Sequence, residues 1–153
     1  MKKVTVLFLL ICSASLFSAH REGLGLGFIA GEPTGFSFKS WTGGKNAWDG
    51  AVAWSTGGKD SFHIHADYLF HNFKEFKPEQ GRMPLYYGIG ARIRFEDRDD
   101  VLGIRAPLGI NYIFHTAPLD IFFEIVPVLN LAPDTDVDME TAVGIRYFFK
   151  TSR

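Results

Sequence analysis

Two histidines lie two positions apart in a stretch where polar and apolar residues alternate. His63 and His65 share one side of this stretch, and Asp67 and His71 continue it. Imidazole and carboxylate groups at this spacing could hold a metal ion, with further ligands from neighbouring strands. A hydrogen-bond network inside the fold is the alternative for the same side chains. We favour the hydrogen-bond network and expect neither a metal ion nor another cofactor.

Acidic residues alternate near the C-terminal end and could bind Ca²⁺. They are Asp134, Asp136, Asp138 and Glu140. Because the segment lacks the glycine and the ligand spacing of a helix-loop-helix calcium site, we expect a solvated acidic loop. A second acidic loop is expected on the same side of the molecule. It contains Glu96, Asp97, Asp99 and Asp100. Both loops could bridge weakly to a membrane surface through divalent cations.

The residue types needed for hydrolytic catalysis are present, but they are scattered. No motif brings serine, histidine and an acidic residue together, so we expect no enzyme. The glycine-rich segment from Gly23 to Gly27 is not a phosphate loop, since no helical pattern follows it. The chain has 16 basic and 17 acidic residues, a net charge of -1. This near-neutral charge provides no positive field for nucleic acid, which we exclude as a partner.

The composition indicates one domain built from β-sheet. A length of 153 residues suits a single domain, and 46% hydrophobic residues are too many for a disordered chain. The chain contains 15 Phe, 5 Tyr, 3 Trp and 16 Gly but a single Cys. Such an excess of aromatic residues and glycine is typical of closed sheets rather than of helical bundles.

The first residues read as a targeting signal. Lys2 and Lys3 precede an apolar run from Val4 to Phe17, which is too short to span a bilayer as a helix. We assign residues 1–19 to a signal peptide and residues 20–153 to the mature domain. Cleavage after Ser15 and lipidation of Cys12 are alternatives for this segment.

The remainder of the chain alternates with a period of two, which predicts strands. Eight runs show the pattern, separated by turns rich in glycine, proline and charged residues. The runs extend over residues 24–28, 36–38, 48–54, 62–70, 87–95, 104–114, 119–125 and 143–149. We therefore predict an all-β fold, an eight-stranded antiparallel up-and-down transmembrane β-barrel.

The two faces of the predicted strands differ in a way that assigns inside and outside. One face is apolar, whereas the other combines small residues with charges, which suits the narrow interior of an eight-stranded barrel. The predicted interior charges are Lys39, Asp49, Asp67, Arg92, Arg94, Arg105, Glu124 and Arg146. Further acidic residues nearer the strand ends complete the pairing of these charges. They are Glu96, Asp120, Asp138 and Glu140.

The apolar face would then contact lipid, with aromatic residues near the borders of the bilayer. The predicted lipid-facing aromatic residues are Trp48, Trp54, Tyr68, Tyr112, Phe114, Tyr147 and Phe149. The alternative is a soluble lipocalin-like or sandwich domain, which would bury the apolar face and expose the glycine and arginine face.

Four segments carry a resemblance to known proteins. They are Gly31 to Gly35, Pro118 to Glu124, Pro127 to Asp136 and Gly144 to Phe149. The mature chain resembles the small eight-stranded outer-membrane barrels of the outer membrane protein A and outer membrane protein X type. It resembles most closely a family of short outer-membrane barrels of uncharacterised function. The resemblance implies a last strand with a terminal aromatic residue that the barrel-assembly machinery recognises.

Two features of the chain depart from this resemblance. Lys150 to Arg153 follow the aromatic residues Tyr147 and Phe149, so the terminal signal is not strict. The resemblance implies short periplasmic turns, yet the long loop from Lys74 to Pro84 falls on the periplasmic side if both termini do.

The sequence thus predicts an integral protein of the bacterial outer membrane. We expect a monomer with a side-chain-filled lumen, in a structural or surface-interaction role and not as an open pore. Its partners would be outer-membrane lipid and the assembly machinery. A lipid-modifying barrel enzyme and a soluble periplasmic lipocalin-like carrier remain as alternatives.

Overall fold

A computed structural model of the chain describes residues 23–32, 34–55 and 61–149. The predicted signal peptide, with Cys12, lies outside these residues. The described residues form nine strands: β1 (Leu24–Glu32), β2 (Thr34–Trp41), β3 (Asn46–Ser55), β4 (Ser61–Asn72), β5 (Leu85–Phe95), β6 (Val101–Arg105), β7 (Leu108–Ile113), β8 (Leu119–Ala132) and β9 (Asp136–Phe149). No helix long and apolar enough to cross a membrane occurs in this part of the chain.

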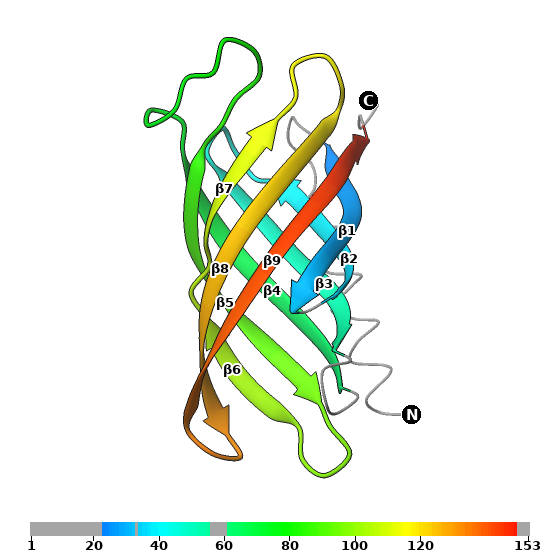
Figure 1. Cartoon of the computed structure of the whole chain (residues 1–153). Helices are drawn as coiled ribbons and strands as arrows, with labels where there is room; N and C mark the ends of the chain where they lie inside the picture. The colour runs from blue at the N-terminus through cyan, green and yellow to red at the C-terminus, as the bar shows by residue number, and fades with distance from the viewer. Residues whose placement is uncertain (1–22, 33, 56–60, 150–153) are drawn as a thin grey trace.

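The strands form one antiparallel sheet that closes on itself as a barrel (Figure 1). Apart from β6 and β7, consecutive strands are neighbours around the wall, and the pairing of β1 with β9 joins the first strand to the last. Leu24 lies opposite Phe149 at one end of this seam, and Glu32 lies opposite Thr141 at the other. The predicted antiparallel barrel is confirmed. Closure removes the free edges that an open sheet of such apolar strands would expose.

The strand count differs from the prediction at one place in the wall. β6 and β7 both lie between β5 and β8, and Ala106 and Pro107 separate them. Because proline has no N–H group, it interrupts the ladder of a strand. The wall stays connected, since Gly88 N–H donates to Pro107 O and Ala106 N–H donates to Pro127 O, each at 3.0 Å. The barrel therefore has eight strand positions, with the sixth predicted run divided in two.

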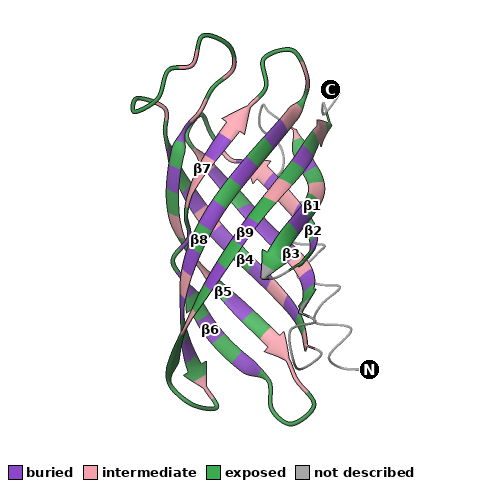
Figure 2. Cartoon of the chain, viewed as in Figure 1, coloured by how far each residue is buried: buried purple, intermediate pink, exposed green. Residues whose placement is uncertain are grey.

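Alternate residues point into the barrel and away from it, as Figure 2 shows in the stripes of buried and exposed residues along each strand. In β1, Leu26 and Phe28 are exposed while Ile29 is buried. Ile29 belongs to a small apolar cluster inside the barrel. Its other members are Ala51, Leu69, Tyr86, Phe122 and Ala142. The period-two pattern of the sequence thus reports the side of the wall correctly.

The last two strands are longer than predicted and correct one interpretation. β8 and β9 have 14 residues each, and Asp136 to Glu140 belong to β9 instead of to a solvated loop. Asp138 and Glu140 turn inward toward arginine side chains, and so acidic residues can continue a strand whose inner face is charged. Asp134 lies in the turn between β8 and β9, as expected.

The two ends of the barrel differ in shape. The long segment between β4 and β5 and the turn between β7 and β8 lie at the end where β9 finishes (Figure 1). An isolated bridge between Arg82 and Ile113 and a hydrogen bond from Tyr112 Oη to Gln80 O, at 3.0 Å, hold the long segment. At the opposite end, β9 runs five residues beyond Thr141, where its pairing with β1 ends.

Candidate functional site

The interior of the barrel is filled by charged side chains, and one group of them surrounds Arg146 on β9. Arg146 Nε lies 2.9 Å from Asp120 Oδ1 on β8, and Arg146 Nη1 lies 3.3 Å from Asp49 Oδ2 on β3. Lys39 Nζ on β2 lies 4.0 Å from Asp120 Oδ2. Lys39, Asp49, Asp120 and Arg146 are all buried, and we call these four residues the Arg146 network.

Aromatic and polar groups complete the surroundings of the Arg146 network. The Lys39 ammonium lies 4.3 Å from the centre of the Trp41 ring, and the Arg146 guanidinium lies 4.1 Å from that of Phe122. Both contacts have the geometry of cation–π interactions. His71 Nε2 lies 2.8 Å from Lys39 Nζ, and His71 Nδ1 lies 2.9 Å from the carbonyl oxygen of Lys45. Both ring nitrogens of this histidine therefore have partners.

A second group of charges is centred on Arg105 of β6. Its Nε donates to Asp67 Oδ1 at 3.0 Å, its Nη1 contacts Glu140, and its Nη2 lies 3.7 Å from Glu124 Oε1. Tyr86 Oη donates to the other oxygen of Glu124 at 2.8 Å. One guanidinium thus joins carboxylates from three strands of the wall.

The same group extends through Arg92 and Arg94 of β5 toward the end of the barrel remote from Phe149. Arg92 contacts Glu140, and its Nη2 lies 3.0 Å from Asp138 Oδ2. Arg94 Nη1 lies 3.5 Å from Asp138 Oδ2, and Arg94 Nε lies 2.7 Å from Glu96 Oε1. We call the connected set the Arg105 network. Its members are Asp67, Arg92, Arg94, Glu96, Arg105, Glu124, Asp138 and Glu140.

A glycine makes room for the Arg105 network. Gly90 on β5 lies opposite Asp67 on β4 and opposite Arg105 on β6. A Cβ atom at Gly90 would collide with Asp67 Oδ1, the atom that accepts from Arg105 Nε. The small residues that mark the inner face of the sequence are therefore needed beside the charged ones.

The structure places seven of the eight predicted interior charges in buried positions. The exception is Arg94, whose side chain is 26% exposed. The eight residues do not form a single network. Lys39, Asp49 and Arg146 lie in one network, and Asp67, Arg92, Arg94, Arg105 and Glu124 lie in the other.

Two of the strongest interior contacts use residues that the sequence placed only near strand ends. Asp120 and Glu140 each bind two basic side chains across the interior. Both residues lie on the inward-facing side of the alternating pattern, and this position was the sequence signal for their role. Neutral hydrogen-bond partners of the charged residues, such as Tyr86 and Asn130, were missed, because nothing in the pattern marks a neutral polar residue as a partner.

His63 and His65 are buried on the inner face of β4, with their ring centres 6.4 Å apart. In the described part of the chain, both ring nitrogens of His63 and Nδ1 of His65 lack a hydrogen-bond partner. His65 Nε2 lies 3.9 Å from Asp67 Oδ2. The predicted hydrogen-bond network therefore includes His71 but not these two residues. Within the same ranges, no group of three or more histidine, cysteine or acidic side chains has a metal-binding arrangement.

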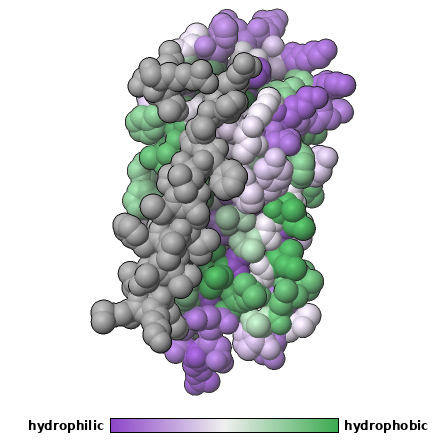
Figure 3. Space-filling model, turned by 180° about the vertical axis from the view of Figure 1, so that it is seen from behind, coloured by the Kyte–Doolittle hydropathy of each residue, from purple (hydrophilic) through white to green (hydrophobic). Residues whose placement is uncertain are grey.

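The outer surface is apolar around the wall. Figure 3 shows hydrophobic residues over the side of the barrel and hydrophilic ones gathered at its two ends. All seven predicted aromatic residues point outward. Some form pairs, with ring centres 5.0 Å apart for Trp48 and Tyr68 and 5.0 Å apart for Tyr147 and Phe149. Trp54 is 43% exposed, Phe114 is 36% exposed, and Tyr112 is half-buried against it.

These features define a small closed antiparallel β-barrel with paired charges inside and apolar side chains outside. The chain is similar in structure to the N-terminal β-barrel domain of OprF from Pseudomonas aeruginosa. The TM-score is 0.60, with 11% sequence identity, over 82% of this chain and 95% of that one. No protein-family model and no curated protein sequence matches the chain. At this identity the similarity shows the fold, and it confirms the barrel part of the expected resemblance.

Proposed function

We propose that the chain is an integral β-barrel protein of the bacterial outer membrane, with a side-chain-filled interior. The observation that carries this proposal is the reversal of the two faces of the sheet. Many large apolar residues on the outside of the wall are exposed, from 37% for Leu24 to 67% for Val137, whereas Arg92, Arg105 and Arg146 inside are 1% exposed. A water-soluble carrier would expose the charges and bury the apolar face. Lipid around the wall accounts for the exposed apolar residues, and a closed barrel leaves no unpaired strand edge in that lipid.

Membrane fractionation tests this proposal against the soluble carrier. We expect the protein to stay in the outer-membrane fraction, to need detergent for release, and to change its electrophoretic mobility on heating. Release by osmotic shock in a form whose mobility is insensitive to heat would overturn the proposal.

The role we propose is structural or in surface interaction, without an open pore. Side chains fill the interior of an eight-stranded barrel. Here ion pairs of the two networks cross the interior, such as the pair of Asp49 on β3 and Arg146 on β9. Planar-bilayer recordings should show no large stable conductance, and such a conductance would contradict this part of the proposal.

We also propose that the barrel is a non-enzymatic monomer which the barrel-assembly machinery inserts. The closed seam between β1 and β9 leaves each subunit complete without a second copy. The exposed rings of Tyr147 and Phe149 near the end of β9 fit the aromatic terminal strand that this machinery uses. Depletion of the machinery should lower the amount of heat-modifiable protein, and light scattering in detergent should give the mass of one chain.

A further inference from the structure

His63 and His65 differ from the other described interior histidine in having unused ring nitrogens. His71, on the same face of β4, has a partner at each nitrogen. By contrast, three of the four ring nitrogens of His63 and His65 are buried without a hydrogen-bond partner among the described residues. A buried polar group without a partner costs free energy, so such a group in a native structure calls for a ligand or another explanation.

Carboxylates outnumber basic groups in the network beside these two histidines. The Arg105 network contains five carboxylates and three arginines. The Arg146 network contains two of each sign. The histidines lie against the first of these. His65 Nε2 is 3.9 Å from Asp67, and β4 pairs with β5 so that His63 is opposite Arg94 and His65 is opposite Arg92.

The positions of the two rings allow them to share one ion. They project from the same side of one strand, and their centres are 6.4 Å apart at an interplanar angle of 86°. Tetrahedral coordination with metal–nitrogen distances of about 2.0 Å brings two imidazole centres to about 5 Å. The cross-strand neighbours on β3 are Ala51 and Ala53, whose methyl groups interfere little with a turn of either ring. The two rings must therefore approach each other by about 1.4 Å.

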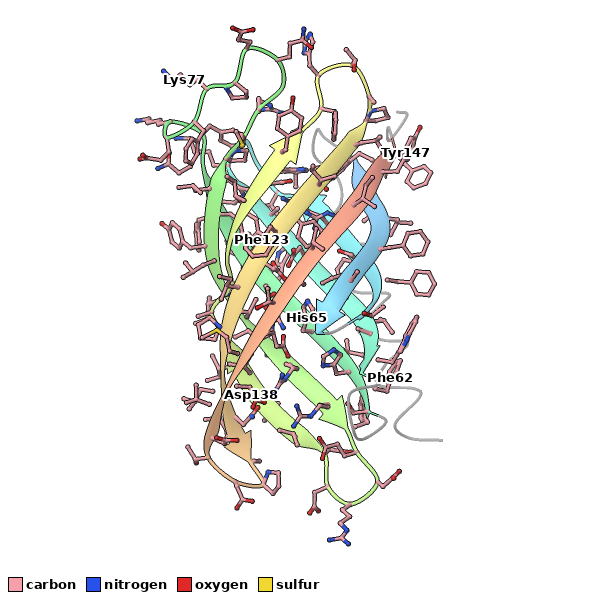
Figure 4. The ribbon with its side chains drawn as sticks, in the orientation of Figure 1. Phe62, His65, Lys77, Phe123, Asp138 and Tyr147 are labelled. Atoms are coloured by element: carbon pink, nitrogen blue, oxygen red, sulfur yellow. The ribbon has the colours of Figure 1, made fainter. Side chains whose placement is uncertain are left out.

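Asp67 supplies the orienting group that metal-binding histidines usually have. Its Oδ2 lies 3.9 Å from Nε2 of His65, so the movement of the ring that brings it toward His63 must also close this gap to a hydrogen bond, with Nδ1 left as the ligand atom. The site is also close to an end of the barrel. His63 is two residues from Ser61, where β4 begins, and this corresponds to about 7 Å along the strand. In Figure 4, His65 lies inside the barrel near the end of β1, and Asp138 lies closer to the end of the barrel at which β4 begins.

We propose that His63 and His65 bind one divalent transition-metal ion of the kind that prefers imidazole nitrogen, such as Zn²⁺ or Cu²⁺. The ligand atoms are Nδ1 of His65 and a ring nitrogen of His63, with water in the remaining positions. Asp67 is a positioning residue. Ca²⁺ and Mg²⁺ do not compete, because they prefer oxygen ligands.

Cu²⁺ and Zn²⁺ binding to the full-length protein tests the proposal. The protein is purified from membranes in detergent with a tag that contains no histidine. Electron paramagnetic resonance should show one bound Cu²⁺ per chain with hyperfine coupling to two nitrogens, and calorimetry should show one Zn²⁺ site. His63→Gln and His65→Gln should each lower the affinity for Zn²⁺ at least tenfold, since even outer groups of metal sites contribute about that much.

Two control variants separate this site from the other histidines. His71→Gln removes an interior histidine of the same strand face, and His115→Gln removes an exposed one; both should leave the affinity for Zn²⁺ unchanged. Heat-dependent mobility shows which variants have folded, and the Cu²⁺ spectrum of the unaltered protein decides the matter if a variant has not. Absence of Cu²⁺ and Zn²⁺ binding, a site without nitrogen ligands, or full affinity in the folded double variant would overturn the proposal. Displacement of Zn²⁺ by equimolar Ca²⁺ would do the same, since it would assign the ion to the carboxylates.

Discussion

The two ion-pair networks inside the barrel differ in charge and in location. The Arg146 network lies among aromatic rings such as Trp41 and Phe122 and has as many basic as acidic members. The Arg105 network reaches the opposite end of the barrel, has two more carboxylates than arginines, and lies beside two histidines with unused nitrogens.

This difference teaches which part of the interior maintains the fold and which part is suited to a ligand. Equal numbers of oppositely charged groups, with aromatic rings packed around them, favour a rigid filling. A network with more carboxylates than arginines, beside histidine nitrogens that lack hydrogen-bond partners, is better suited to binding a further group. Substitutions in the two networks and on the outer face can sharpen or break this distinction.

The largest effect is expected from Arg105→Leu. The change leaves Asp67, Glu124 and Glu140 without the guanidinium that joins them, in a network in which carboxylates already outnumber arginines. Removing one partner of a buried ion pair costs about 3–5 kcal/mol, and we expect the upper end here. Urea unfolding of the refolded protein in detergent measures the change. A loss below that of Arg146→Leu would contradict the difference between the networks.

Arg146→Leu should be the next largest effect, about 3 kcal/mol in the same assay. Asp120 keeps Lys39 as a basic neighbour at 4.0 Å, whereas Asp49 loses its ion pair with Arg146. The contact with Phe122 is also lost. The matched comparison is with Arg105→Leu, since both changes remove one buried guanidinium and add the same leucine.

A smaller effect is expected from Gly90→Ala, which adds a methyl group next to Asp67. Overpacking of a filled interior costs about 1–3 kcal/mol. The new Cβ would displace the Asp67 carboxylate from Arg105 and would also meet the carbonyl oxygen of Ala66, so the loss should shrink, but not vanish, in an Asp67→Asn background. Equal losses in both backgrounds would show that Gly90 does not act through this pair.

Much of the fold could be predicted from the sequence because a strand exposes its two faces alternately. The alternation of Leu24, Leu26 and Phe28 with glycine gave the side of the wall for β1, and the same pattern did so for the other strands. The division of one strand at Pro107 and the extension of β9 to Asp136 were missed. Both depend on what the opposite strands provide: the Gly88 N–H donor and the Pro127 carbonyl acceptor beside Pro107, and arginines that donate to the carboxylates inside.

The candidate site was only partly predictable, because its contacts join strands far apart in the chain. Asp49 and Arg146 are 97 residues apart in the sequence, yet they meet inside the barrel. Alternation identifies inward residues, but it does not give the level along the barrel axis at which each side chain lies. That level separates His71, which meets Lys39, from His63 and His65, three of whose four ring nitrogens have no hydrogen-bond partner among the described residues.

The smallest effect tests the assignment of inside and outside with one kind of substitution. Ile29→Val removes a methylene from the apolar cluster inside the barrel, and Ile110→Val removes one from the outer face. A cavity inside the packed barrel should cost about 1 kcal/mol. On the outer face, detergent or lipid chains fill the space, so the loss should stay below about 0.5 kcal/mol. Equal losses for the two variants in the unfolding assay would mean that Ile110 is packed against protein, and the outer face of β7 would then need another partner than lipid.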